Sequence, residues 1–362
     1  MNALYIEKRD GGIKCDWEDV FLSTGASGGI VQCLKMLTFG EGITRTGVMI
    51  PTPQYPLYSA SISEFQAVRV NYYLDEETNW SLKIPELERS YEEACKTCTP
   101  RVLCIINPGN PTGNVLSREN IEGIVKFAHD KNLFLMADEV YQDNVYDADC
   151  EFHSFKKVIS ELGEPYKSNL MYASFHSTSK GYMGECGLRG GYMELCNWDP
   201  AVKIEMIKLL SSRLCPPVTG QAAMNCVVSP PVEGDEIYEQ WVGERDGVLA
   251  DLKVKAKLTA DSFNEIPGVS CQSVQGAMYS FPQITMPEKF VKHCEDSGLT
   301  PDAVYCMELL EKKGICVVPG SGFGQRPGTH HFRMTILPAK HLMEQVMTGF
   351  AEFHNEFCEK WN

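Results

Sequence analysis

The sequence feature that most constrains the fold is a regular alternation of short apolar runs with longer amphipathic stretches, between about residues 20 and 195. The runs VLCII and LFLMA are apolar throughout, which is typical of strands covered on both faces. Between them, SRENIEGIVKFAHDKN begins with a serine cap and places Ile121, Ile124 and Val125 on one helical face. We therefore predict an α/β fold with a mostly parallel sheet and covering helices. The predicted strands are DVFL, GVMI, VRVNYY, RVLCII, LFLMADEV, LMYASF and GGYME.

The pattern changes after residue 235. The stretch EIYEQWVGERDGVLADLKVKAKLTADSFNEI, residues 236–266, is a long and highly charged helical pattern, and we interpret its charges as a solvated face. Short strands mixed with helices follow it, which indicates an α+β arrangement. We predict a large ligand-binding α/β domain over residues 1–235, and a bridging helix with a small C-terminal α+β domain over residues 236–362.

Composition excludes several classes of protein. The net charge of −15 and the lack of a basic run argue against binding nucleic acid. No apolar stretch approaches the roughly 18 residues that a membrane helix needs, and the N-terminus does not resemble a signal peptide. The 15 cysteines are scattered, as expected of free thiols in a reducing compartment, and the lone pair Cys95 and Cys98 lacks nearby histidines. We expect a cytoplasmic protein without a metal site or a membrane partner.

A possible anion site lies where STGASGGIVQCLKML follows the strand VFL and opens a helix. Free backbone N–H groups at that helix start, around Gly25, Ala26 and Ser27, can hold an anion. The stretch matches neither the dinucleotide-binding glycine pattern nor the P-loop, so an empty helix start explains it equally well.

Polar side chains also follow two of the buried strands, at the edge where ligands bind in such sheets. Asn110, in NPGNPTGN, can donate to an oxygen of a bound ring. Asp138, which ends LFLMAD, can pair with a protonated ring nitrogen such as that of pyridoxal phosphate, although a lone carboxylate here is more often a helix cap. Glu139 points to the other face of the strand, so the two carboxylates are not an acid–base pair.

Two tyrosines and an arginine are further candidates. Tyr141 can bond a ring hydroxyl, and Tyr55, in PTPQYPLY, can stack on a ring face, whereas either tyrosine alone is more often a core residue. Arg333, in HHFRMTI, alternates with apolar neighbours on a predicted strand. It is either a clamp for a substrate carboxylate or one half of a surface ion pair.

The stretch SFHSTSKGYMGECGLRGGY surrounds one lysine with hydroxyl groups and glycines. Lys180 can form an imine with an aldehyde, while Ser177 and Arg189 bind a phosphate on the same molecule. The planar fork of Arg189 suits a phosphate because it donates two parallel hydrogen bonds. This stretch therefore predicts a site for a compound that carries both a phosphate and a carbonyl group.

Taken in order, these residues resemble the class I and II aminotransferases of PLP fold type I along nearly the whole chain. The stretches NPGNPTG, DEVYQDNVY, FHSTSKGYMGECGLRGGY, CPPVTGQAAM and ICVVPGSGFGQ are similar to those of the alanine aminotransferases in particular. The resemblance implies pyridoxal 5′-phosphate as the cofactor and Lys180 as the internal-aldimine lysine. It implies the other roles as follows: Asp138 on the pyridine nitrogen, Asn110 and Tyr141 on the ring oxygen, Ala26, Ser27, Ser177 and Arg189 on the phosphate, Tyr55 stacked on the ring, and Arg333 and Asn110 at the substrate.

The activity that the resemblance implies is transamination of L-alanine and 2-oxoglutarate to pyruvate and L-glutamate, with ping-pong kinetics, in a homodimer. A related aminotransferase that uses another amino acid or glyoxylate is one alternative, and a truncated, non-catalytic protein of this fold is another. Members of the family carry a further N-terminal segment before the region that begins here near IEKRDGGI. We therefore expect a shortened chain, and a mitochondrial form is the alternative to a cytoplasmic one.

Overall fold

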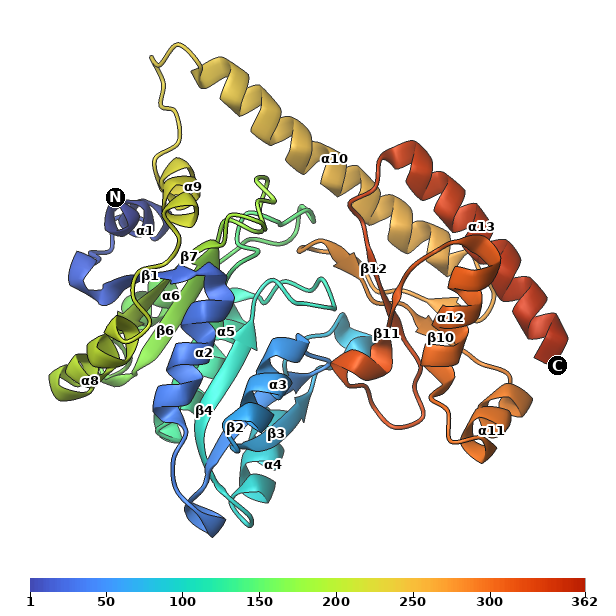
Figure 1. The fold of residues 1–362 in the computed structure, drawn as a ribbon, viewed down its shortest axis with the longest axis horizontal. Coiled ribbons are helices and arrows are strands. Elements are labelled where there is room, and N and C mark those ends of the chain that lie inside the picture. The colour runs from blue at the N-terminus through green and yellow to red at the C-terminus, as the bar shows by residue number, and fades with distance from the viewer. Residues whose placement is uncertain (362) are drawn as a thin grey trace.

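The computed structural model describes residues 1–361, and a seven-stranded sheet dominates their first half (Figure 1). The strand order is β1-β7-β6-β5-β4-β2-β3, and the pairs among β2 to β6 are all parallel. The predicted α/β fold with a mostly parallel sheet is therefore confirmed. The strands of this sheet are β1 (Val20–Thr24), β2 (Thr46–Thr52), β3 (Val68–Tyr73), β4 (Thr99–Ile106), β5 (Phe134–Asp138), β6 (Tyr172–Ser177) and β7 (Gly190–Cys196).

Strand β7 is the antiparallel member of this mostly parallel sheet. It runs antiparallel to both neighbours, with Ser177 opposite Gly191 in β6 and Thr24 opposite Gly190 in β1. The reason is the connection: a parallel return needs a crossover, usually a helix, and the chain between β6 and β7 has no helix. The loop that replaces the helix carries Lys180 and Arg189.

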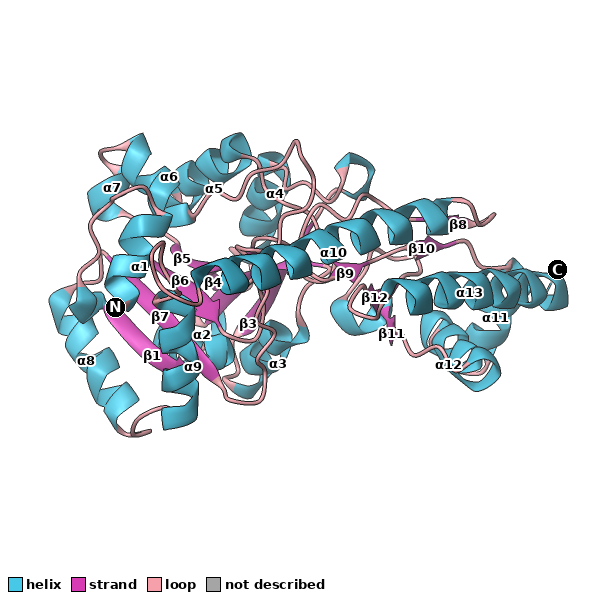
Figure 2. Ribbon diagram, turned by 90° about the horizontal axis from the view of Figure 1, so that it is seen from above, coloured by secondary structure: helices cyan, strands magenta, loops and turns pink. Residues whose placement is uncertain are grey.

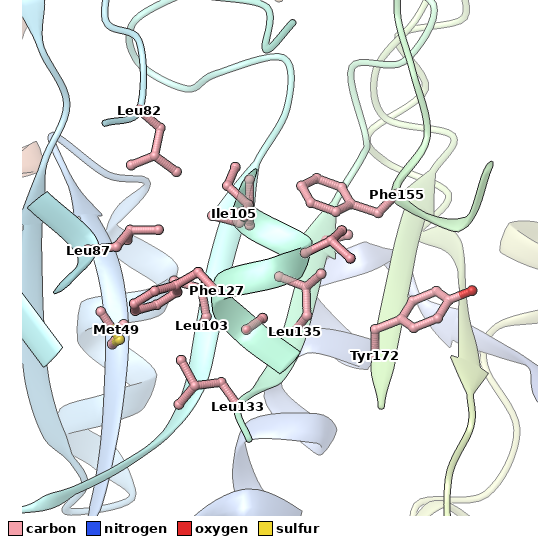
Figure 3. Close-up of a cluster of buried hydrophobic side chains, with 14 of the residues drawn as sticks. Met49, Leu82, Leu87, Leu103, Ile105, Phe127, Leu133, Leu135, Phe155 and Tyr172 are labelled. Carbon is pink, nitrogen blue, oxygen red and sulfur yellow. The ribbon is translucent and has the colours of Figure 1, made fainter. Parts of the chain in front are cut away.

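Helices cover both faces of the sheet, as the apolar strands require. Alternate residues of β4 show this, since Leu103 and Ile105 pack beneath α4 and α5 whereas Cys104 packs beneath α2 and α3. Figure 3 shows the first of these cores, in which Phe127 of α5 lies beside Leu103 and the cluster also includes Leu135. The helices of this half are α1 (Asn2–Arg9), α2 (Gly25–Leu37), α3 (Pro56–Glu64), α4 (Ile84–Ala94), α5 (Arg118–Asp130), α6 (Phe155–Leu162), α7 (Tyr166–Asn169), α8 (Pro200–Ser211) and α9 (Val218–Val228).

The 27-residue helix α10 leads from this half into a smaller group of elements, as seen from above in Figure 2. There α13 packs along α10, and Phe263, Phe332 and Phe350 lie in one buried core. The domain boundary predicted at residues 235 and 236 falls just before α10 and stays a prediction. The remaining elements are α10 (Tyr238–Asn264), β8 (Val269–Ser270), β9 (Tyr279–Ser280), β10 (Gln283–Ile284), α11 (Glu288–Asp296), α12 (Pro301–Lys313), β11 (Val318–Pro319), β12 (Phe332–Thr335) and α13 (Lys340–Trp361).

The short strands of this second group form two small sheets. Strand β12 lies between β11 and β9, and β8 pairs with β10. Among residues 1–361, no helix combines the length and the apolar character that crossing a bilayer requires. Four 3₁₀ segments complete the structure: η1 (Trp17–Asp19), η2 (Gly42–Thr44), η3 (Glu76–Thr78) and η4 (Gly320–Phe323).

Candidate active site

One cavity of about 230 Å³ lies at the carboxyl ends of the parallel strands, where ligands bind in sheets of this kind. All the side chains predicted to contact the cofactor line it, although they come from loops and elements far apart in the sequence. Apolar groups from Ile30, Leu57, Ile106 and Val140 complete its wall. The predicted residues that line it are Ala26, Ser27, Tyr55, Asn110, Asp138, Tyr141, Ser177, Lys180 and Arg189.

The first turn of α2 closes one end of the cavity. The N–H of Gly25 donates to the carbonyl oxygen of Arg189 at 3.1 Å. The side chain of Thr24, which precedes the helix, makes no capping hydrogen bond, so the backbone N–H groups of the first turn from Ala26 onward are available to an anion. Arg189 crosses this turn, and its Nη2 donates to Ser27 Oγ at 3.0 Å and to the carbonyl oxygen of Thr24 at 3.3 Å. A positive charge and free N–H groups therefore meet at one point, which is the chemistry of a phosphate site.

Two glycines allow this close approach. Gly25 has a φ of 68°, and a Cβ there would lie 2.4 Å from Nη2 of Arg189. Gly191 packs directly against the backbone of the helix start, since its Cβ would lie 2.4 Å from the carbonyl carbon of Gly25. Ser177 lies beside them, where its Oγ donates to the Gly190 carbonyl at 3.2 Å and accepts the N–H of Ser179 at 3.1 Å.

Asp138 lines the cavity at the end of β5 and is 4% exposed. Its Oδ2 accepts a hydrogen bond of 2.9 Å from the hydroxyl of Tyr58, while its Oδ1 is buried without a partner. Burial raises the pKa of Asp138 from 3.8 to about 6, against opposing effects of Tyr58, the Val140 backbone N–H and Lys180. A buried carboxylate with one free oxygen fits a cationic N–H donor such as a protonated pyridine nitrogen.

Lys180 reaches into the cavity from the β6–β7 loop. Its Nζ lies 3.3 Å from the hydroxyl of Tyr279 and 5.5 Å from the ring centre of Tyr141. The hydroxyl of Tyr141 donates to that of Tyr279 at 3.2 Å. Burial opposes ionisation of Tyr279, but Lys180, Tyr141 and Arg333 together lower its pKa. The amine therefore lies at the end of a short chain of polar groups.

Arg333 and Asn110 meet between the two groups of elements. Nη1 of Arg333, on β12, donates to Oδ1 of Asn110 at 3.2 Å. The guanidinium lies 4.2 Å from the ring centre of Tyr279 and 4.8 Å from that of Phe323. Within residues 1–361 Arg333 forms no ion pair with a carboxylate, so its charge is free for an anionic ligand.

Glu139 lies on the other face of β5, as the strand alternation predicts. It accepts the backbone N–H of Phe155 at 2.8 Å, bonds the hydroxyl of Ser174 and lies near Arg9 of α1. It therefore ties α1 and α6 to the sheet rather than taking part in the site.

Two further residues at the site, Tyr58 and Tyr279, were not predicted from the sequence. Tyr58 lies one helical turn after Tyr55 in PTPQYPLY, so a predicted helix there would have placed it under the same cavity. Tyr279 stands in GAMYSF, which carries only the signal of a short strand. Neither position reveals its contact in the sequence, because the partners are 80 and 99 residues away.

Comparison with known proteins assigns the family. The family model "Aminotransferase class I and II" matches residues 3–348. The chain belongs to the class I and II aminotransferases. This confirms the resemblance, and with it the enzyme class, a pyridoxal phosphate-dependent transaminase that acts on amino acids and 2-oxo acids.

Named relatives are similar to this aminotransferase over nearly its whole length. Alanine aminotransferase 2 of Xenopus tropicalis is 59% identical over 360 residues, which span 99% of this chain and 69% of that relative. Alanine aminotransferase 1 of Homo sapiens is also 59% identical, with 99% and 73% covered. Among solved structures, the alanine aminotransferase of Pyrococcus furiosus has a TM-score of 0.81 at 25% identity, with 98% of this chain and 81% of that chain covered.

A second solved structure supports the fold assignment. An aminotransferase from Escherichia coli has a TM-score of 0.80 at 27% identity. The match covers 99% of this chain and 80% of the bacterial chain. The predicted PLP fold type I is therefore confirmed. Pyridoxal phosphate, the cofactor of this family, fits the cavity of this aminotransferase on two observations: the unpaired Oδ1 of Asp138, and the helix start crossed by Arg189.

Proposed function

We propose that this aminotransferase moves the amino group of L-alanine to 2-oxoglutarate and so forms pyruvate and L-glutamate. The observation that carries the proposal is the cavity that brings together Lys180, Asn110 and the free oxygen of Asp138, with Arg333 held beside it by its bond to Asn110. The choice of alanine rests on the relatives that are 59% identical to this chain over 360 residues.

Each end of the cavity has a separate role in holding the cofactor. Ser27, Ser177 and Arg189, with the N–H groups from Ala26 onward, bind the phosphate, and Asp138 binds the ring nitrogen. Asn110 and Tyr141 bond the ring oxygen, and Tyr55, half exposed at the start of α3, stacks on the ring. When bound, pyridoxal phosphate supplies an aldehyde carbon and a cationic ring that accepts electrons from the substrate Cα.

Lys180 would hold the cofactor at that aldehyde carbon, and its Nζ is the group that would move a proton at the substrate Cα. Arg333 binds the substrate α-carboxylate, and Asn110 orients the guanidinium through the bond at Nη1. Tyr279 holds the amine of Lys180 beside Tyr141, within reach of a substrate that Arg333 has bound. Both substrates carry an α-carboxylate next to the reacting carbon, so one site serves them in turn.

The assembly and the compartment are part of the same proposal. We propose a homodimer, supported by apolar side chains that one chain leaves exposed around the start of α9, where Leu214 is 84% and Val218 74% exposed. We also propose the cytoplasm as the compartment, because the fifteen cysteines are free thiols in the structure. Cell fractionation tests the compartment.

The proposal is tested by mixing the purified protein with pyridoxal phosphate, reducing it with borohydride and mapping the labelled peptide. We expect the label on Lys180 alone, a visible absorbance band before reduction, and loss of that band with release of pyruvate when alanine is added. Lys180→Ala removes label and turnover, whereas Lys126→Ala, on the far side of the sheet in α5, leaves both intact.

Two results would contradict the proposal in different ways. Absence of any lysine label in the wild-type protein would overturn the enzyme assignment. A labelled protein whose visible absorbance band is unchanged by alanine but lost with another amino acid would overturn the assignment of alanine as the substrate.

A further inference from the structure

Asn144 is a fully buried residue that directly follows the segment carrying Asp138 and Tyr141, yet no role above uses it. Its side chain encloses the backbone of Gly181. Oδ1 accepts the N–H of Gly181 at 2.9 Å, and Nδ2 donates to the carbonyl oxygen of Gly181 at 3.3 Å. Gly181 is the residue after Lys180, so one amide side chain fixes the backbone from which that lysine extends.

The backbone of Asn144 binds two further segments of the site. Its N–H donates to the carbonyl oxygen of Tyr141 at 2.8 Å, and its carbonyl oxygen accepts the N–H of Ala277 at 3.0 Å. The packing is close, because a Cβ on Gly276 would lie 2.6 Å from that carbonyl oxygen. Ala277 is two residues from Tyr279, which contacts the amine of Lys180.

Tyr146 closes the arrangement into a loop of hydrogen bonds. Nδ2 of Asn144 also donates to the hydroxyl of Tyr146 at 3.1 Å, and that hydroxyl donates to the carbonyl oxygen of Ala277 at 2.6 Å. Every polar group of Asn144 therefore has a partner, and the partners belong to the three segments that carry Tyr141, Lys180 and Tyr279. A buried, fully satisfied network of this kind defines one arrangement, because any shift leaves polar groups unpaired.

We propose that Asn144 is a positioning residue that sets the place of Lys180 relative to Tyr141 and Tyr279. The proposal rests on the function proposed above. Gly181 has a φ of 72°, so the backbone turns sharply there and the direction of Lys180 depends on what holds this turn. A displacement of about 1 Å at a reacting group costs on the order of 100-fold in rate, and Asn144 is the side chain that prevents it.

The chain contains a matched control. Asn264, at the end of α10, binds the backbone of Cys271 in the same way, with Nδ2 donating to its carbonyl oxygen and Oδ1 accepting its N–H, both at 2.9 Å. This pair lies away from the cavity. Asn264→Ala therefore removes two hydrogen bonds of the same kind, to Cys271, without changing the loop that carries Lys180.

The first measurement uses the protein without added cofactor. We compare amide hydrogen exchange in the wild type, Asn144→Ala and Asn264→Ala. The Gly181 amide should exchange about 10-fold faster in Asn144→Ala, since it loses one buried hydrogen bond, and at the wild-type rate in Asn264→Ala. Unchanged exchange at Gly181 in Asn144→Ala would overturn the proposal.

The second measurement uses the loaded enzyme. We expect Asn144→Ala to lower kcat for alanine about 100-fold with KM changed by less than about 3-fold, and to shift the pH at which the visible band of the lysine-bound cofactor titrates. Asn264→Ala should leave kcat and the titration at wild-type values. Both variants could instead lose unfolding temperature equally while kcat and the pH titration of the visible band stay at wild-type values. That result would show that Asn144 has a structural role only, and it would overturn the proposal.

Asn144→Asp keeps the test informative if the alanine variant does not fold. Aspartate retains an acceptor for the Gly181 N–H but loses the donor to the Gly181 carbonyl and to Tyr146. We expect the Gly181 amide to stay protected and kcat to fall by about 10-fold; an unchanged kcat would contradict the proposal. The wild-type lysine label is measured alongside, and its absence would count against the proposed function instead.

Discussion

A buried carboxyl group with an unused oxygen is the residue-scale feature that most affects the site. Asp138 accepts one side-chain hydrogen bond, from Tyr58, and among residues 1–361 its second oxygen has no hydrogen-bond partner. Burial without full hydrogen bonding costs free energy, and the raised pKa of Asp138 records this cost. In the proposed site the cofactor nitrogen supplies the missing donor, so we expect the protein without cofactor to be less stable than its fold allows.

This cost predicts a pH dependence in the protein without cofactor. The folded pKa of Asp138, about 6, lies above its ordinary value of 3.8, so the folded state binds the proton more tightly. The stabilisation is present below 3.8 and is lost as pH rises through 6. Across that window the free energy of unfolding should fall by up to about 3 kcal/mol from this group alone. Urea unfolding of wild type and Asp138→Asn between pH 4 and 8 measures it.

In Asp138→Asn the free energy of unfolding should not fall in this way as pH rises. This variant should therefore be more stable than the wild type above pH 6. Tyr58→Phe is the complementary variant, because it removes a bond that lowers the pKa of Asp138. Its fall in stability should extend to higher pH than in the wild type. Parallel pH profiles for wild type and Asp138→Asn would show that Asp138 does not titrate in this range.

At the scale of elements, the start of α2 and the start of β7 form one unit. Gly191 lies against the backbone of Gly25 and Ala26, and Arg189 crosses the same turn. Their contact depends on the antiparallel direction of β7, which brings Gly190 opposite Thr24. The proposed phosphate site is therefore a property of two elements together.

A methyl group placed between these elements should separate them. In Gly191→Ala the new Cβ would lie 2.4 Å from the backbone of Gly25, so α2 must move away from β7. We expect the affinity for pyridoxal phosphate, measured by fluorescence titration, to fall by about 10-fold or more, in line with overpacking costs of 1–3 kcal/mol. Gly28→Ala is the control, since its Cβ makes only an ordinary contact of 3.5 Å with Thr24. Equal affinities in the two variants would show that the contact does not shape the phosphate site.

The sequence predicts the elements better than their directions. The apolar runs indicated where the strands end. Because parallel strands end at one edge of the sheet, Asn110, Asp138 and Lys180 were expected to meet there, and all three line one cavity. The direction of β7 was not readable, because GGYME looks the same in either sense. Tyr58 and Tyr279 were missed since their contacts join distant segments, and no local pattern encodes such pairs.

At the scale of the whole molecule, the cavity lies where the sheet and the second group of elements meet. Arg333 on β12 contacts Asn110, which follows β4, and Tyr279 on β9 contacts Lys180. A movement of the two groups relative to each other would change the distance between the proposed carboxylate clamp and the lysine. Around the start of α9, where Gly220 packs against the backbone of Arg189, the chain exposes the apolar residues on which the proposed dimer rests.

The proposed dimer predicts a concentration-dependent mass. Sedimentation of the wild type at micromolar concentration should give twice the chain mass of 40.5 kDa. Leu214→Asp places a charge on a side chain that is 84% exposed in one chain, and we expect it to shift the protein to monomer. Leu342→Asp, on α13, should leave the mass unchanged, because that side chain is 44% exposed and lies far along the chain from α9. A dimer that persists in Leu214→Asp would place the interface elsewhere.

The bond between Arg189 and the carbonyl oxygen of Thr24 joins residues 165 positions apart. A growing chain on the ribosome therefore cannot close the phosphate site until β6 and the loop after it have emerged. Since ligands stabilise only the conformation that binds them, pyridoxal phosphate can stabilise the sheet only once its last strand is in place. Nascent chains that end before residue 189 lack the arginine of the proposed phosphate site, so we expect pyridoxal phosphate not to stabilise them through this contact.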